Sequence, residues 1–117
     1  MSEIVVQEKA FNFAVRVVRM YQTLVEHRRE NVLSKQCLRS GTAIGALLAE
    51  STHAQSKADF INKVSIALKE ANETLYWLNL LKATGYLAEV EHKSIYEDAE
   101  ELVRILVAIL KTSKKNR

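Results

Sequence analysis

The sequence predicts an all-α, single-domain protein that folds as an antiparallel, up-down-up-down four-helix bundle, and three observations lead to this prediction. The chain has 117 residues, no proline and only three glycines, so residues that interrupt helices are scarce. Apolar residues make up 48% of the chain, which is enough for one compact core. Apolar side chains also recur in steps of three and four over long stretches, as on the buried side of a helix.

The first helix is predicted over residues 6–26, where two adjacent apolar rows share the same spacing. One row contains Phe11, Ala14, Val18, Tyr21 and Val25, and the other contains Ala10, Phe13, Val17, Met20 and Leu24. Because two rows are wider than a two-stranded coiled coil needs, this helix is expected to contact more than one neighbour. A polar, mostly basic stripe is expected on its other side, formed by Lys9, Asn12, Arg16, Arg19 and Thr23.

The second helix is predicted over residues 32–52, after a polar connection, and it contains two mid-helix glycines, Gly41 and Gly45. A glycine inside a helix costs about 1 kcal/mol relative to alanine. Both are therefore expected to allow close packing against a neighbouring helix. We interpret the G-x-x-x-G spacing in this way and not as a membrane dimerisation motif.

The third helix is predicted over residues 57–84, because Ser56 and Asp59 form an S-x-x-D pattern at its start and Gly85 is placed to end it. The fourth helix is predicted over residues 90–112, followed by a basic tail at 113–117. Short connections between four long amphipathic helices favour the up-down-up-down arrangement.

The last part of the fourth helix is apolar at every position from 102 to 110 except Arg104. One side of a single bundle does not cover a helix that is apolar on all sides, so its outer side is expected to meet another subunit. The residues predicted for this interface are Leu102, Ile105, Val107 and Leu110. Nine residues are far fewer than the ~20 that a membrane span needs, so no membrane association is expected.

Charge is segregated along the chain although the net charge is only +3. Residues 1–69 contain ten Lys or Arg and six Asp or Glu, residues 70–101 contain two and eight, and residues 102–117 contain five and none. A basic surface of this kind suits an anionic partner such as RNA or DNA, although a solvated helix face gives the same pattern. The candidate contacts are Lys9, Arg16, Arg19, Arg28, Arg29, Lys35, Lys111, Lys114, Lys115 and Arg117.

Catalytic and metal sites are not expected. Glu50 with His53 and Glu89 with His92 both have the E-x-x-H spacing of di-iron bundles, for which Glu70 or Glu73 would be further ligands. In an up-down bundle these two motifs lie at opposite ends, about 30 Å apart. A metal-binding bundle is therefore only a remote alternative.

The remaining chemistry-bearing residue is Cys37, the single cysteine, which lies on an apolar row without a histidine nearby. Phosphate-binding glycine loops are absent, so the sequence predicts no enzyme and no cofactor. A lone cysteine and the lack of a signal-peptide pattern favour a cytoplasmic protein.

Three motifs identify a family resemblance. They are LRSGTAIGALLAE at residues 38–50, Ser56-x-x-Asp59-Phe60, and IALKEANETLYWL at residues 66–78. Together they resemble the four-helix-bundle family encoded in 23S rRNA intervening sequences, which is related to the accessory variability proteins of diversity-generating retroelements. The resemblance extends over residues 11–110. The sequence departs from the family pattern at Leu47, where relatives usually have Asn, and at Ala43, where Ser is common.

The resemblance implies a homopentameric barrel of bundles and, in the retroelement branch, a basic assembly that binds nucleic acid and a reverse transcriptase. A non-catalytic, oligomeric, RNA-binding protein is therefore the first expectation. The alternative is an adaptor that binds a protein such as a reverse transcriptase without contacting nucleic acid.

Overall fold

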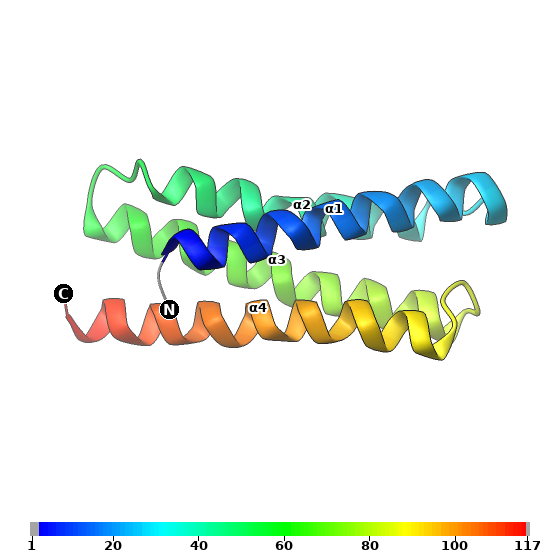
Figure 1. Cartoon of the computed structure of the whole chain (residues 1–117). Helices are drawn as coiled ribbons and strands as arrows, with labels where there is room; N and C mark the ends of the chain where they lie inside the picture. The colour runs from blue at the N-terminus through cyan, green and yellow to red at the C-terminus, as the bar shows by residue number, and fades with distance from the viewer. Residues whose placement is uncertain (1–2, 117) are drawn as a thin grey trace.

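The computed structural model describes residues 3–116, which form four α-helices connected by short loops. They are α1 (Glu3–Arg28), α2 (Leu33–Ser51), α3 (Lys57–Ala83) and α4 (Glu89–Lys115). Consecutive helices run in opposite directions along one elongated bundle, with principal extents of 47 × 21 × 19 Å (Figure 1). The helices pack in a closed ring, with α1 against α2, α2 against α3, α3 against α4, and α4 against α1. The predicted all-α four-helix bundle is confirmed.

Only one of the two predicted apolar rows of α1 is buried in the core. Ala10, Phe13, Val17 and Leu24 are buried, whereas Phe11 of the other row is 67% exposed. The buried row packs with residues from the other three helices. The largest fully buried side chains from these helices are Ile44, Val64, Leu78, Leu81, Leu102 and Leu106.

The two glycines of α2 allow this helix to approach α1 closely, as the sequence predicted. A Cβ atom added to Gly41 would lie 3.0 Å from Val17 Cγ2, and one added to Gly45 would lie 3.6 Å from the backbone of Ala10. On the other side of α2, the Thr74 hydroxyl donates a hydrogen bond to Ser40 Oγ at 2.8 Å inside the core. Small and polar side chains therefore bring α2 close to both of its neighbours.

The helix ends have distinct local causes. The Glu30 carboxylate accepts hydrogen bonds from the first backbone N–H groups of α2, those of Val32, Leu33 and Ser34, at 2.7–3.0 Å. Ser56 caps α3 by accepting from the Asp59 N–H at 3.0 Å, as its sequence pattern predicted. Gly85 follows α3 with a φ of +85°, which is the left-handed conformation expected for a residue that ends a helix.

No helix among residues 3–116 is long and apolar enough to cross a membrane.

Candidate nucleic-acid interface

Two cations of the predicted α1 stripe are paired with carboxylates of α4. Lys9 Nζ lies 3.2 Å from Glu101 Oε1, and Arg16 Nη1 lies 2.6 Å from Asp98 Oδ2. Arg16 also donates to the hydroxyl and the carbonyl of Ser94. The stripe therefore faces the acidic side of α4, which compensates the charge of these two predicted contacts within the subunit.

Arg28, Arg29 and Lys35 lie where α1 ends and α2 begins, and Arg19 lies nine residues before the end of α1. We call these four residues the α1–α2 basic cluster. All four side chains are exposed, and no ion pair among residues 3–116 involves any of them. Arg28 donates to the carbonyl of Gly85 at 3.3 Å, and its guanidinium lies 4.9 Å from the centre of the Tyr86 ring. This cluster is a positive surface that no carboxylate compensates among residues 3–116.

The connection between α1 and α2 is held by Glu30, next to this cluster. Arg29 adopts a φ of +53°, which turns the chain after α1. Burial alone would raise the pKa of Glu30, but the backbone N–H groups of Ser34, Leu33 and Val32 outweigh this effect and lower it. The buried carboxylate therefore stays charged and fixes the turn that presents Arg28 and Arg29.

The remaining predicted contacts lie at the other end of the bundle. Lys111, Lys114 and Lys115 are exposed near the C-terminal end of α4, and Arg117 lies outside the described residues. Residues 113–117 were predicted to be a tail after the fourth helix. This prediction is wrong for residues 113–115, because α4 continues to Lys115. Cations in the last turn suit the negative end of a helix. Figure 1 shows this end of α4 at the opposite end of the bundle from the α1–α2 connection. The ten predicted contacts therefore do not form one patch on a subunit.

The predicted subunit interface on α4 requires a correction at two of its four residues. Leu102 and Leu110 are buried in the core of their own subunit, with exposed fractions of 1% and 7%, so they have almost no surface left for a partner. Ile105 and Val107 are half-buried. Ile105 and Val107 therefore remain predicted interface residues, and Ile105 also lines a groove of about 550 Å³ with Phe60 and Ile109.

Four of the seven large apolar side chains that are exposed among residues 3–116 lie on α1. Ile4, Phe11 and Val18 are 72%, 67% and 36% exposed, and they follow one another at intervals of seven residues. We call these three residues the α1 apolar strip. Beside the strip, Phe11 borders a shallow groove of about 330 Å³ together with Gly45 and Ala46 of α2. The apolar row that contains Phe11 and Val18 was predicted to be buried. The interval of seven residues from Ile4 to Phe11 and from Phe11 to Val18 is the sequence signal that could have identified the strip.

The E-x-x-H motifs do not converge on one site. Glu50 and His53 lie where α2 ends, and Glu89 and His92 lie where α4 begins, at opposite ends of the bundle. Within residues 3–116, no three His, Cys, Asp or Glu residues form a group that could hold a metal ion. His92 Nε2 is 2.8 Å from Asn79 Oδ1.

The other two proposed metal ligands, Glu70 and Glu73, are paired with Arg39 across α2 and α3. Glu73 also accepts a hydrogen bond from Trp77 Nε1 at 3.3 Å. These carboxylates therefore join two helices through ion pairs with one arginine.

Cys37 is fully buried, and burial raises the pKa of its thiol to about 12. A thiol with this pKa is protonated at neutral pH, so it has little of the thiolate that a nucleophile or a metal ligand requires.

Two comparisons with known proteins point to related families. Residues 2–108 match the family model described as 23S rRNA-intervening sequence protein. A crystal structure of a protein of unknown function from the S23 ribosomal protein family of Bacteroides thetaiotaomicron is similar to this chain, with a TM-score of 0.93 and 52% sequence identity. That similarity covers 95% of this chain and 99% of the other. No curated protein matches the chain.

Proposed function

The chain belongs to the 23S rRNA-intervening sequence protein family, and from this premise we propose that it is a non-catalytic, homo-oligomeric protein that binds RNA through basic surfaces. The observation that carries the proposal is the α1–α2 basic cluster, whose four cations have no carboxylate partner among residues 3–116. Cations that are not compensated within the protein are available to phosphates, and the release of counterions from RNA favours their binding.

The three lysines at the end of α4 supply a second basic surface on each subunit. Because the two surfaces lie at opposite ends of a bundle 47 Å long, they form two separate footprints on one subunit. Assembly of several copies places many such footprints side by side, and contacts that are weak singly then add to a useful affinity.

The α1 apolar strip supports the homo-oligomer. Residues at intervals of seven lie along one side of a helix, and such a strip suits the packing of another helix along it. The occupant that we propose is a second copy of this chain, and five copies are expected from the family resemblance. Burial of Phe11 in such an interface would remove one of the largest exposed apolar side chains from water.

A protein adaptor is the second candidate function, and the same strip favours it. A different protein, such as a reverse transcriptase, would occupy the strip if this chain did not assemble with itself. Native mass spectrometry separates the two candidates, since self-assembly gives a defined multiple of the 13.3 kDa subunit and the adaptor on its own gives a monomer.

The proposed function is tested with single-stranded RNA and two variants of equal charge. One variant carries Arg28→Ala, Arg29→Asn and Lys35→Ala, with Asn chosen because it tolerates the positive φ of residue 29. The control carries Lys69→Ala, Lys82→Ala and Lys93→Ala, three exposed lysines without ion pairs among the described residues. Fluorescence anisotropy at 50 mM KCl measures the dissociation constant of each protein.

We expect the α1–α2 variant to lose affinity by about tenfold or more, and the control by about threefold or less. Equal losses would show that net charge and not the α1–α2 basic cluster governs binding. The absence of RNA binding by the unmodified protein at this salt concentration would refute the proposed function.

A further inference from the structure

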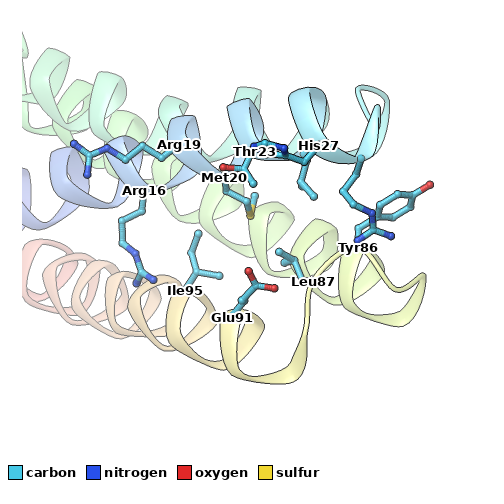
Figure 2. Close-up of a pocket in the computed structure, with 11 residues that line it drawn as sticks. Arg16, Arg19, Met20, Thr23, His27, Tyr86, Leu87, Glu91 and Ile95 are labelled. Carbon is cyan, nitrogen blue, oxygen red and sulfur yellow. The ribbon is translucent and has the colours of Figure 1, made fainter.

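A cavity of about 540 Å³ opens between α1, α4 and the connection from α3 to α4, beside the α1–α2 basic cluster. Figure 2 shows Met20, Leu87 and Ile95 in the space between the two helices. With the buried Leu24, these side chains give the cavity an apolar floor. Its volume is within the range of pockets that bind small organic groups.

An aromatic ring and a guanidinium lie together at the mouth of this cavity. Tyr86 lines it, and Arg28 lies over the Tyr86 ring with its Cζ atom 4.9 Å from the ring centre. Unpaired nucleobases stack on aromatic side chains and on arginine planes, and this stacking tolerates any base. The pair of residues therefore offers a stacking surface at the entrance to an apolar space.

The rim of the cavity is suited to phosphate. Arg19, Thr23 and His27 line it from α1, and their spacing of four residues places them along one side of the helix. His27 has only a distant contact with Glu26, at 4.0 Å. Arg19 extends along α1 in Figure 2, and its exposed side chain is in no ion pair among residues 3–116.

A single carboxylate, that of Glu91, points into this space from α4 (Figure 2). Its Oε1 atom accepts a hydrogen bond from the Ala88 N–H at 2.9 Å, which fixes the side chain. The second oxygen is then positioned to accept from a donor inside the cavity. Among nucleobases, cytosine, adenine and guanine have an exocyclic amino group that is such a donor. Uracil has only its N3–H, which lies between two carbonyl oxygens that a carboxylate repels.

We propose that this cavity binds one unstacked, amino-bearing nucleobase of single-stranded RNA, with the adjoining phosphate at Arg19 and His27. The inference rests on the proposed function and names the form of RNA that the protein recognises. A base inside a duplex remains stacked and paired, so it does not enter the cavity. Single-stranded RNA is therefore bound more tightly than double-stranded RNA.

Assembly through the α1 apolar strip leaves the cavity open. At 100° per residue, Phe11 and Val18 of the strip lie on roughly the opposite side of α1 from Met20 and His27. A second subunit on the strip and a base in the cavity therefore occupy different sides of the same helix.

The experiment compares labelled 12-nucleotide oligo(rC) and oligo(rU) with a 12-base-pair RNA duplex by fluorescence anisotropy at constant salt. We expect oligo(rC) to bind the unmodified protein at least about fivefold more tightly than oligo(rU) or the duplex. Thr23→Tyr places a ring at the exposed rim without a change of charge, and Tyr86→Leu removes the stacking ring. Each is expected to lower the affinity for oligo(rC) at least about fivefold, with little effect on the duplex.

Two further variants complete the design. Asn72→Tyr, at an exposed position on α3, is the control for the added ring and is expected to leave every affinity unchanged. Glu91→Gln keeps an oxygen for the Ala88 N–H but turns an amide donor toward the base, so the preference for oligo(rC) over oligo(rU) is expected to disappear. Circular dichroism confirms that each variant is folded.

The outcomes distinguish this proposal from the proposed function. If all three RNAs bind equally well and Thr23→Tyr and Tyr86→Leu change nothing, the protein binds RNA but the nucleobase site is refuted. If the unmodified protein binds none of the RNAs, the proposed function itself is refuted. If Tyr86→Leu and Asn72→Tyr weaken binding to the same extent, the loss is unspecific and the cavity is not the site.

Discussion

Gly41 of α2 lies so close to Val17 of α1 that a Cβ atom at residue 41 would be 3.0 Å from one methyl carbon of the valine and 3.1 Å from the other. Val17 is fully buried, so it has little room to move away. This contact sets the distance between α1 and α2 and places the helix ends that form the α1–α2 basic cluster.

The substitution Gly41→Ala is expected to destabilise the protein despite a better helix propensity. Alanine gains about 1 kcal/mol over glycine inside a helix, but overpacking a core costs about 1–3 kcal/mol. The control is Gly45→Ala, whose Cβ would meet Ala10 at an ordinary distance of 3.6 Å or more and is expected to stabilise by about 0.5–1 kcal/mol. Urea unfolding at one fixed protein concentration measures both. Equal stabilisation by the two substitutions would contradict the close contact at Gly41.

Glu30 is expected to make the stability of the protein depend on pH. Its pKa in the folded protein is below the ordinary value of 4.5, so its stabilising effect is fully present above about pH 4.5 and is lost as the pH falls through the folded pKa. Glu30→Gln removes the charge from three hydrogen bonds to α2, and it is expected to cost about 1–2 kcal/mol at pH 7. The difference between the two proteins in urea unfolding should shrink below pH 4.5. A difference that stays constant from pH 7 to pH 3 would be inconsistent with a charged cap.

The pair of rows on α1 shows how far the sequence could predict the structure. The helices and their order followed from spacing, from Ser56 and from Gly85, because these signals are local. The choice between the rows of Phe11 and Phe13 was not local, since both have the same spacing and only the positions of α2 and α4 decide which row is buried. Leu102 was misassigned to a subunit interface for the same reason. Its apolar neighbours could not reveal how many sides of α4 are covered.

The candidate site was predictable only in part. The sequence identified which residues are basic but not which of them are paired with carboxylates. Glu101, for example, lies far from its partner Lys9 in the sequence. Pairing across α1 and α4 therefore could not be read from the chain. The cavity beside Tyr86 is formed by the connection between α3 and α4 meeting α1, and this arrangement had no sequence signal.

Phe11 is expected to be required for self-assembly but not for folding. Phe11→Ser removes a side chain that is 67% exposed in the subunit, so the helical content should be retained while the assembly dissociates. Val90→Ser is the control, because Val90 is 80% exposed but lies outside the α1 apolar strip. Sedimentation velocity at micromolar concentration measures both. An unchanged sedimentation coefficient for Phe11→Ser would exclude the strip as the interface, and a monomeric unmodified protein would exclude the oligomer.

Lys9 is expected to contribute little to RNA binding although it is basic. Its ammonium group is already paired with Glu101, so a phosphate gains little from replacing that partner. Lys9→Ala should therefore change RNA affinity by about twofold or less, and Lys35→Ala by clearly more. Anisotropy titrations of the two single variants provide the comparison. A larger loss for Lys9→Ala would show that the α1 stripe, and not the helix end, is the RNA-binding surface.

The salt dependence of RNA affinity is the most direct test of the account. Anisotropy titrations of single-stranded RNA between 50 and 200 mM KCl give the slope of log K against log of the salt concentration. Four phosphates bound by the α1–α2 basic cluster of one subunit predict a slope of about −3. The triple variant at Arg28, Arg29 and Lys35 should reduce the slope to about −1. An affinity that does not change over this range of salt would contradict the claim that this protein binds RNA through uncompensated cations.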